Sequence, residues 1–283
     1  MEDNITDIDY DSVQALEEFN GFHNNSGVGQ LYLCATPIGN LEDITFRVLR
    51  ILKEVDIIAA EDTRNSIKLL NHFEINTPMT SYHEYNKYDK AKVLVEKMLK
   101  GMSVAVITDA GTPGISDPGE ELVRQALASG IKVSSVPGAA ACITALTMSG
   151  QATRRFAFEA FLPADKNERK DILKELEDET RTMIIYEAPH RLLKTLKELS
   201  EVLGGSRAVT ICKELTKRYE NSMVTTLAEA CSYYENNQPR GEYVLVIAGK
   251  DRNELKEEAQ AQWLAMSEKE QHKRRRAYKK SIV

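Results

Sequence analysis

The sequence predicts an α/β fold of two domains, each a sheet flanked by helices. From Leu31 onward, short apolar runs rich in β-branched residues alternate with amphipathic segments, a pattern typical of parallel strands joined by helices. The 283 residues exceed the length of about 100 to 150 that a single domain usually has. A composition of 42% hydrophobic and 28% charged residues is that of an ordinary globular protein, so two buried cores are expected.

The first domain is expected over residues 31–150. Its strands are predicted at 31–35, 56–60, 103–108 and 131–136, and its helices include 44–55 and 120–129. The helix over 44–55 repeats apolar residues at spacings of three and four, which predicts one buried face. The domain is expected to end near Gly150, because residues 149–153 are small and polar, as an interdomain connection tends to be.

The second domain is expected over residues 151–250, with a mixed sheet. Its strands are predicted at 156–161, 182–186, 207–212, 224–227 and 243–248, and a helix at 192–202. Residues 1–30 form an acidic extension and residues 251–283 a charged tail. Residues 1–28 and the segment after Lys250 are expected to be mobile.

Charge is unevenly distributed along the chain. The formal net charge is -6, but residues 1–30 carry seven acidic side chains and no Lys or Arg, whereas residues 273–280 are strongly basic. The total charge therefore does not exclude a nucleic-acid partner, because local basic patches recognise such a partner.

The cysteine spacing argues against a metal site, and the N-terminus and apolar segments indicate where the protein is located. Cys34, Cys142, Cys212 and Cys231 are widely spaced, with no paired motif and no nearby histidine cluster, so buried reduced thiols are expected and no metal site. The acidic N-terminus is unlike a secretory signal, and no stretch approaches the roughly 20 apolar residues that span a bilayer. A cytoplasmic protein without a membrane segment is the expectation.

Three loops that follow predicted strands point to a ligand site. Residues 108–119 have the sequence Thr-Asp-Ala-Gly-Thr-Pro-Gly-Ile-Ser-Asp-Pro-Gly, and residues 35–40 and 136–141 are shorter loops of similar character. Glycine lets a ligand approach the main chain, and open α/β sheets bind ligands beyond the carboxyl ends of their strands. An ordinary turn is the alternative, but three Gly and two Pro in residues 108–119 exceed what a turn needs.

Several common cofactor motifs are absent. The chain has no G-x-G-x-x-G for a dinucleotide and no Gly-Lys-Ser/Thr phosphate loop, which argues against a dehydrogenase and a P-loop NTPase. It also lacks the glycine-rich first loop of Rossmann-type methyltransferases, so a methylase would need a different fold.

A series of motifs nevertheless resembles the tetrapyrrole methylase superfamily. In order, these are Thr36-Pro-Ile-Gly-Asn-Leu, Glu61-Asp-Thr-Arg, Ser81-Tyr-His-Glu, Asp109-Ala-Gly-Thr-Pro-Gly and Val136-Pro-Gly-Ala. Three further motifs resemble the branch that methylates a ribose 2'-hydroxyl of small-subunit ribosomal RNA: Tyr186-Glu-Ala-Pro-His-Arg, Lys213-Glu-Leu-Thr-Lys and Gly241-Glu-Tyr-Val-Leu-Val-Ile. The resemblance spans about residues 30 to 249. The sequence departs from the family pattern at Tyr85, at Gln151 and at Glu159-Ala160, where small residues with Gly are usual.

The resemblance implies two α/β domains with S-adenosylmethionine folded into the cleft between them, no metal, and a homodimer. The implied substrate is a decoding-centre cytidine of 16S rRNA within the small ribosomal subunit. Cofactor contact is implied for Pro37, Asp109, Gly111, Thr112, Pro113, Ile115, Ser116 and Ala140. Contact from the second domain is implied for Tyr186, Lys213 and Tyr243.

Two polar groups are candidates for framing the ribose. Glu61, Asp62 and Arg64 follow one strand, and Glu187 and His190, with Arg191, follow another. Methyl transfer needs in-line positioning of the hydroxyl and a base for late proton loss, so few residue types suffice. The alternative is structural: residues 61–64 cap the next helix, and His190 and Arg191 form the first turn of theirs.

The basic residues of the second domain are candidates for contact with RNA phosphates. They are Arg154, Arg155, Lys166, Arg169 and Lys170, with Lys213, Lys217 and Arg218 as a further group. The alternative is that they are solvated surface charges. Two rival functions stay open at this point: C-methylation of a tetrapyrrole precursor, and a non-catalytic assembly factor that binds rRNA.

Overall fold

The computed structural model describes residues 27–265, which divide into two compact units. The first runs to Ala139 without Ile38–Asn40, and the second comprises Ile38–Asn40 and the residues from Ala140 onward. The sequence placed the boundary near Gly150. It falls earlier because helix α6 (Ala141–Met148) packs against the sheet of the second unit.

The first unit is built on a parallel five-stranded sheet in the order β3-β2-β4-β1-β5. The strands are β1 (Gln30–Cys34), β2 (Ile57–Ala60), β3 (Met79–Ser81), β4 (Val104–Ile107) and β5 (Lys132–Val136). Four of them match predicted strands; β3, three residues long, was not predicted. Because every neighbouring pair is parallel, the carboxyl ends of all five strands meet at one edge.

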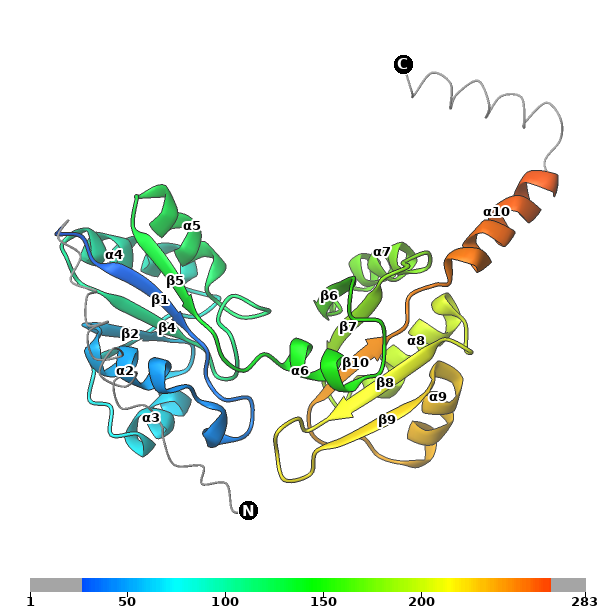
Figure 1. The fold of residues 1–283 in the computed structure, drawn as a ribbon, viewed down its shortest axis with the longest axis horizontal. Helices are drawn as coiled ribbons and strands as arrows, with labels where there is room; N and C mark the ends of the chain where they lie inside the picture. The colour runs from blue at the N-terminus through cyan, green and yellow to red at the C-terminus, as the bar shows by residue number, and fades with distance from the viewer. Residues whose placement is uncertain (1–26, 266–283) are drawn as a thin grey trace, which may run out of the picture. The chain divides into compact units, whose positions relative to one another are not determined.

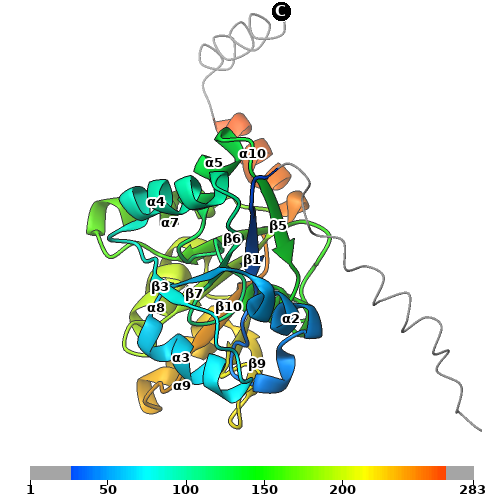
Figure 2. The ribbon, with the colours of Figure 1, turned by 90° about the vertical axis from the view of Figure 1, so that its left-hand side faces the viewer.

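Helices cover both faces of this sheet (Figures 1 and 2). Helices α2 (Phe46–Glu54) and α3 (Thr63–His72) lie on one face, and α4 (Lys87–Leu99) and α5 (Glu120–Ala128) on the other. A short 3-10 helix, η1 (Leu41–Asp43), precedes α2. The chain therefore leaves β1 toward one face and leaves its neighbour β4 toward the opposite face. Such a divergence opens a crevice where ligands of open α/β sheets bind.

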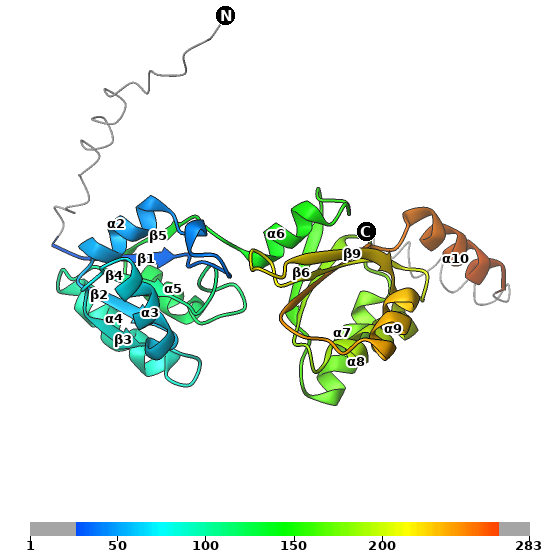
Figure 3. The same ribbon diagram turned by 90° about the horizontal axis from the view of Figure 1, so that it is seen from below.

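The second unit has a mixed sheet, as predicted, in the order β6-β7-β10-β8-β9. The strands are β6 (Phe156–Phe161), β7 (Thr182–Glu187), β8 (Ala208–Lys213), β9 (Asn221–Thr226) and β10 (Tyr243–Ile247). Only the pairing of β6 with β7 is parallel. Helices α7 (Lys166–Leu176), α8 (Leu192–Leu203) and α9 (Leu227–Asn236) cover one face, and α6 lies on the other (Figure 3).

The segment after Lys250 differs from its prediction. It forms helix α10 (Arg252–Ala265), whose first turn is capped by the Asp251 carboxylate, which accepts a hydrogen bond from Asn253 N at 2.6 Å. The acidic extension up to residue 26 and the basic run at 273–280 lie outside the described residues. Among residues 27–265, no helix combines the length and the apolar character needed to cross a membrane.

Candidate cofactor site and catalytic loops

The loops after β1 and β4 are joined through their main chains. Thr36 N donates to Gly111 O at 2.9 Å, and Gly111 N donates to Thr36 O at 3.1 Å. The Thr36 hydroxyl also donates to Thr108 O at 3.0 Å. Gly111 has φ 83, a left-handed conformation that favours glycine. The two loops that flank the crevice thus hold each other without using exposed side chains.

The third predicted loop joins the same group. A Cβ atom on Gly138 would lie 2.7 Å from the Cβ of Ala35, so glycine is needed for the close approach of the loop after β5 to the end of β1. The Thr112 hydroxyl donates to Ala139 O at 3.0 Å. Residues 108–119 fold back on themselves, since a Cβ on Gly119 would lie 2.8 Å from Gly114 N. The structure therefore brings the three predicted loops together.

The predicted cofactor residues of the first unit lie on these loops, and they differ in how exposed they are. Ile115 and Ser116 are exposed, and Ser116 has φ 67, while Gly111 and Pro113 are buried beneath them. Ala140 is the N-terminal cap residue of α6 and belongs to the second unit. The Thr108 hydroxyl is buried and has no hydrogen-bond partner among the described residues, which leaves a polar group for a ligand at the start of the long loop.

Three carboxylates lie at the same edge. Glu61 Oε2 accepts a hydrogen bond from Asp109 N at 3.2 Å, and Asn65 Nδ2 donates to Asp109 Oδ2 at 3.0 Å. Burial, with the negative charges of Glu61 and Asp109, raises the pKa of Asp117 to about 7. Burial also raises the pKa of Glu61. The loops therefore provide a negative potential that suits a cationic ligand such as a sulfonium.

Asp62 and Arg64 form a local cap. Asp62 is the N-terminal cap of α3 and accepts a hydrogen bond from Arg64 N at 2.9 Å, and its carboxylate pairs with the Arg64 guanidinium at 2.6 Å. Hydrogen bonds from Arg64 lower the pKa of Asp62 to about 2. A carboxylate with so low a pKa is a weak proton acceptor, so the structural alternative describes this pair well.

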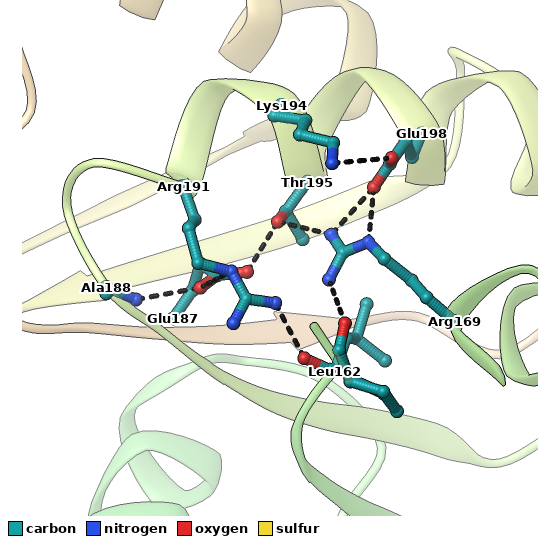
Figure 4. A network of polar contacts seen from close by, with 9 residues as sticks. Leu162, Arg169, Glu187, Ala188, Arg191, Lys194, Thr195 and Glu198 are labelled. Atoms are coloured by element: carbon teal, nitrogen blue, oxygen red, sulfur yellow. Dashed lines mark hydrogen bonds and ion pairs between the residues drawn. The ribbon is translucent and has the colours of Figure 1, made fainter. Parts of the chain in front are cut away.

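Glu187 lies at the centre of a buried ion network (Figure 4). Its side chain is 0% exposed; one oxygen accepts from Ala188 N at 2.9 Å and faces Arg191 Nε at 3.3 Å, and the other accepts from the Thr195 hydroxyl. Thr195 also accepts from the buried Arg169, at 2.7 Å. Both Glu187 oxygens are thus engaged in holding the loop at 186–191.

The other members of this loop have separate positions. Arg191 caps α8 and donates to Leu162 O at 2.6 Å. His190 is exposed on the turn before α8. Arg169, predicted to contact RNA, is buried and pairs with Glu198 at 2.7 Å, so it is not available to a phosphate at the surface. The structural alternative thus accounts for Arg191 as well as for Asp62.

The three predicted cofactor residues of the second unit share one end of its sheet but not one face. Tyr243 pairs with Lys213 across β10 and β8 and with Glu187 across β10 and β7, so these three side chains point to the helix-covered face. Tyr243 is buried there, and its hydroxyl accepts from Arg240 N at 3.2 Å. Tyr186 points to the opposite face, where its hydroxyl accepts from Cys142 N at the start of α6, at 2.9 Å.

Asp117 and Asn65 were not singled out from the sequence. Asp117 stands in the long glycine-rich loop, so its position gave a signal, but its raised pKa depends on Glu61, which is remote in sequence. Asn65 lies one turn into α3 and carries no motif of its own; only the fold places its amide against Asp109.

Comparison with known proteins identifies the family. The sequence profile described as Tetrapyrrole (Corrin/Porphyrin) Methylases matches residues 30–231. Proteins named ribosomal RNA small subunit methyltransferase I are close in sequence. The one from Synechocystis sp. is 50% identical over 82% of this chain and 84% of its own length. The one from Bacillus subtilis is 45% identical over 88% and 85%.

Solved structures share the fold at much lower identity. Diphthine synthase aligns over 77% of this chain and 89% of its own, with a TM-score of 0.61 and 13% identity. Uroporphyrin-III C-methyl transferase from Thermus thermophilus, complexed with S-adenyl homocysteine, aligns over 77% and 97%, with a TM-score of 0.54 and 20% identity. With its fold, its loop motifs and its sequence in agreement, the chain belongs to the tetrapyrrole methylase family and, within it, to the ribosomal RNA small subunit methyltransferase I group.

Proposed function

We propose that this chain transfers a methyl group from S-adenosylmethionine to small-subunit ribosomal RNA, at the ribose 2'-hydroxyl of a decoding-centre cytidine. The observation that carries the substrate class is the 50% identity, over 82% of the chain, with a protein named for methylation of small-subunit ribosomal RNA. The cofactor supplies an activated methyl group on a positively charged sulfur. The nucleotide and the position on its ribose rest on the motif resemblance.

The residues of the first unit fit this cofactor. Glycines are partly exposed at Gly114 in the loop after β4 and exposed at Gly138 in the loop after β5, and the unpartnered Thr108 hydroxyl adds a polar group. The carboxylates of Glu61 and Asp109 provide negative charge for a sulfonium, and the same charges contribute to the raised pKa of Asp117. The proposed contacts are Pro37, Asp109, Gly111, Thr112, Pro113, Ile115 and Ser116 in the first unit, with Ala140. In the second unit, Tyr186 and Lys213 remain candidates for a side-chain contact, whereas the buried Tyr243 would act through its main chain.

The chemical step places few demands on the protein. The 2'-oxygen forms a bond to the methyl carbon as the carbon–sulfur bond breaks, the sulfur becomes neutral, and the hydroxyl proton leaves to a base or to water. Among the candidates, Glu61 is the best-suited acceptor, because burial raises its pKa, whereas Asp62 is tied to Arg64 and Glu187 is enclosed. Arg64 and His190 are the side chains that we propose frame the ribose.

Methyl transfer from labelled S-adenosylmethionine tests this function. Small ribosomal subunits and a tetrapyrrole precursor are offered in parallel, and any labelled nucleotide is mapped. We expect label on one cytidine ribose. Label on the macrocycle alone would contradict the substrate, and cofactor binding with no transfer to either would favour a non-catalytic assembly factor.

The remaining parts of the proposal follow from the substrate and the resemblance. Work on ribosomal subunits takes place in the cytoplasm, so we propose that location. The tetrapyrrole-methylase resemblance also leads us to propose a homodimer. Light scattering at several concentrations tests the dimer, and a monomer mass throughout would contradict it.

A further inference from the structure

The second unit contains a cavity of about 620 Å³ at the end of its sheet remote from Tyr186 and Tyr243. Its walls come from the connection before β6 (residues 151–155), the start of β7 and the link from β10 to α10. Since β10 pairs Tyr243 with Glu187 and Ile247 with Met183, the two ends of this strand lie about 13 Å apart at the usual rise per residue. Within the second unit, the cavity is thus separate from the proposed methyl-transfer residues.

The backbone around the cavity is fixed by hydrogen bonds. The Thr182 hydroxyl donates to Ala152 O at 2.7 Å, and Thr182 N donates to Arg155 O at 3.3 Å. On the opposite wall, Lys250 N donates to Glu179 O at 2.7 Å. A Cβ on Gly249 would lie 2.3 Å from the main chain of Thr180, so these two segments are in close contact. The side chains that line the cavity therefore extend from ordered main chain.

Positive charge predominates in the cavity. Its lining includes the cationic side chains of Arg154, Arg155, Lys250 and Arg252 and a single carboxylate, Asp251. Lys250 is ion-paired with Asp178 at 3.0 Å, and Asp251 caps α10. The three guanidinium groups, in contrast, make no ion pair with any residue of the described range 27–265.

Three other arginines of the second unit have carboxylate partners. Arg181, next to the cavity wall, pairs with Glu179 at 2.5 Å, the buried Arg169 pairs with Glu198, and the half-buried Arg191 pairs with Glu187. Arg154 and Arg155 are adjacent in sequence, exposed and like-charged, so a bound anion would reduce their mutual repulsion. Guanidinium groups match the geometry of phosphate oxygens and form paired hydrogen bonds with them.

We propose that this cavity binds phosphates of the RNA backbone, as an anchoring site separate from the site of methyl transfer. The inference rests on the proposed function for the identity of the RNA, while the preference for phosphate follows from the unpaired guanidinium groups. A cationic ligand fits poorly, because positively charged side chains predominate over the single carboxylate in the lining. Because no residue that lines the cavity is among the proposed methyl-transfer residues, the anchor is expected to strengthen substrate binding and to leave the chemical step unchanged.

The test replaces two of the cationic residues of the cavity and compares this variant with one that lacks two cationic residues elsewhere. We expect Arg154→Gln/Arg155→Gln to raise the KM for small ribosomal subunits about tenfold with kcat unchanged, and to lower the slope of log affinity against log salt by about 1.5. The control Lys53→Gln/Lys100→Gln removes the same charge from two exposed residues of the first unit and should leave both quantities within twofold of wild type. The variant Arg154→Lys/Arg155→Lys keeps the charge and should retain the salt slope.

The possible outcomes separate the two proposals. Unchanged subunit affinity and salt slope in a folded Arg154→Gln/Arg155→Gln protein would overturn the anchoring site. If that variant does not fold, as judged by its unfolding curve, Arg252→Gln gives the same test. If wild type transfers no methyl group to rRNA, the proposed function fails, but retention of labelled subunits on filters still measures the anchor.

Calorimetry with tripolyphosphate distinguishes a second source of phosphate. Binding of tripolyphosphate to wild type that is lost in Arg154→Gln/Arg155→Gln, together with unchanged affinity for subunits, would assign the cavity to a free polyphosphate and overturn the RNA assignment. Loss of both would support the cavity as a phosphate site that RNA occupies.

Discussion

The loops of the first unit and the loop at 186–191 of the second are held in place by different interactions. The former are tied by main-chain hydrogen bonds between Thr36 and Gly111 and by the close contact of Gly138 with Ala35. The latter is tied by a buried carboxylate, Glu187, which is bound by Thr195 and Arg191. The first arrangement combines main-chain hydrogen bonds and glycines with two threonine hydroxyl bonds, and uses no charged side chain. The second is centred on one charged side chain.

This difference has consequences for each site. Main-chain ties leave the remaining N–H groups and the exposed Ile115 and Ser116 free to face a ligand, and they tolerate changes in most side chains. A buried charge network is stable only while all its members are present, because an unpaired ion in a protein interior is strongly unfavourable. A single substitution in this network is therefore expected to lower the stability of the second unit more than a single side-chain substitution in the loops lowers that of the first.

The largest effect is expected for Glu187→Ala. Removing the carboxylate leaves Arg169 and Arg191 without part of their compensation inside the protein, and we expect a loss of about 3 to 5 kcal/mol in the free energy of unfolding, measured with urea. Glu201→Ala removes an exposed carboxylate from the neighbouring helix α8; it is the control and should change stability by less than about 0.5 kcal/mol. A loss below about 1 kcal/mol for Glu187→Ala would mean that the network does not hold this loop.

The next effect sharpens the description of the first unit. In Gly119→Ala, the added Cβ would lie 2.8 Å from Gly114 N, so the long loop has to shift. We expect a stability loss of about 2 kcal/mol from overpacking and, by calorimetry, about tenfold weaker binding of S-adenosylmethionine. Gly130→Ala is the comparison: φ is 72 and nothing lies within 4 Å, so stability should fall but cofactor affinity should not. Equal affinity in both variants would contradict the role of Gly119.

The carboxylates of the first unit predict a smaller, pH-dependent effect. Burial and the charges of Glu61 and Asp109 raise the pKa of Asp117 from 3.8 to about 7 in the folded protein. The folded state therefore binds this proton more tightly than the unfolded state, so the contribution to stability is greatest below about pH 4 and falls as the pH rises to about 7. Urea unfolding of Asp117→Asn between pH 4 and 8 should lack that slope.

An exposed carboxyl elsewhere provides the control for this measurement. Asp171→Asn on α7 should keep the slope of wild type. An unchanged slope in Asp117→Asn would assign the pH dependence to another group. In the comparison of the two units, such a result would mean that the charge of the first unit is less concentrated at its loops than the structure indicates.

The sequence predicted most of the fold because hydrophobic periodicity follows from local geometry. Alternation of apolar runs and amphipathic segments located the strands of both sheets, but β3 was missed because three half-buried residues give no periodic signal. The domain boundary was placed too late, since the association of α6 with β7 and β10 is a tertiary contact. Helix α10 was missed because charged residues without a strong apolar face resemble a solvated tail.

The candidate site was predicted unevenly for a related reason. Glycine-rich loops after parallel strands are recognisable in sequence, and the meeting of residues 35–40, 108–119 and 136–141 follows from the alignment of strand ends. Polar residues are harder to assign, because the same Glu, Asp or Arg serves as a base, a cap or a buried ion. Only the structure shows that Asp62 is a helix cap and that Glu187 is enclosed in a network.

The smallest predicted effect concerns a departure from the family pattern at the entrance to the second unit. The register of β6 with β7 shifts between Phe158 and Ala160, and Ala160 has φ 52, where alanine is strained by roughly 1 kcal/mol and glycine is not. Ala160→Gly should therefore raise the free energy of unfolding by about 1 kcal/mol, measured with urea. Ala157→Gly in the same strand is the control: Ala157 is buried and not in the left-handed region, so this change should lower stability. A loss of stability in both variants would mean that the bulge tolerates the alanine without strain. The second unit would then use a side chain to stabilise a tight backbone conformation, as it does in the Glu187 network, whereas the first unit uses glycine.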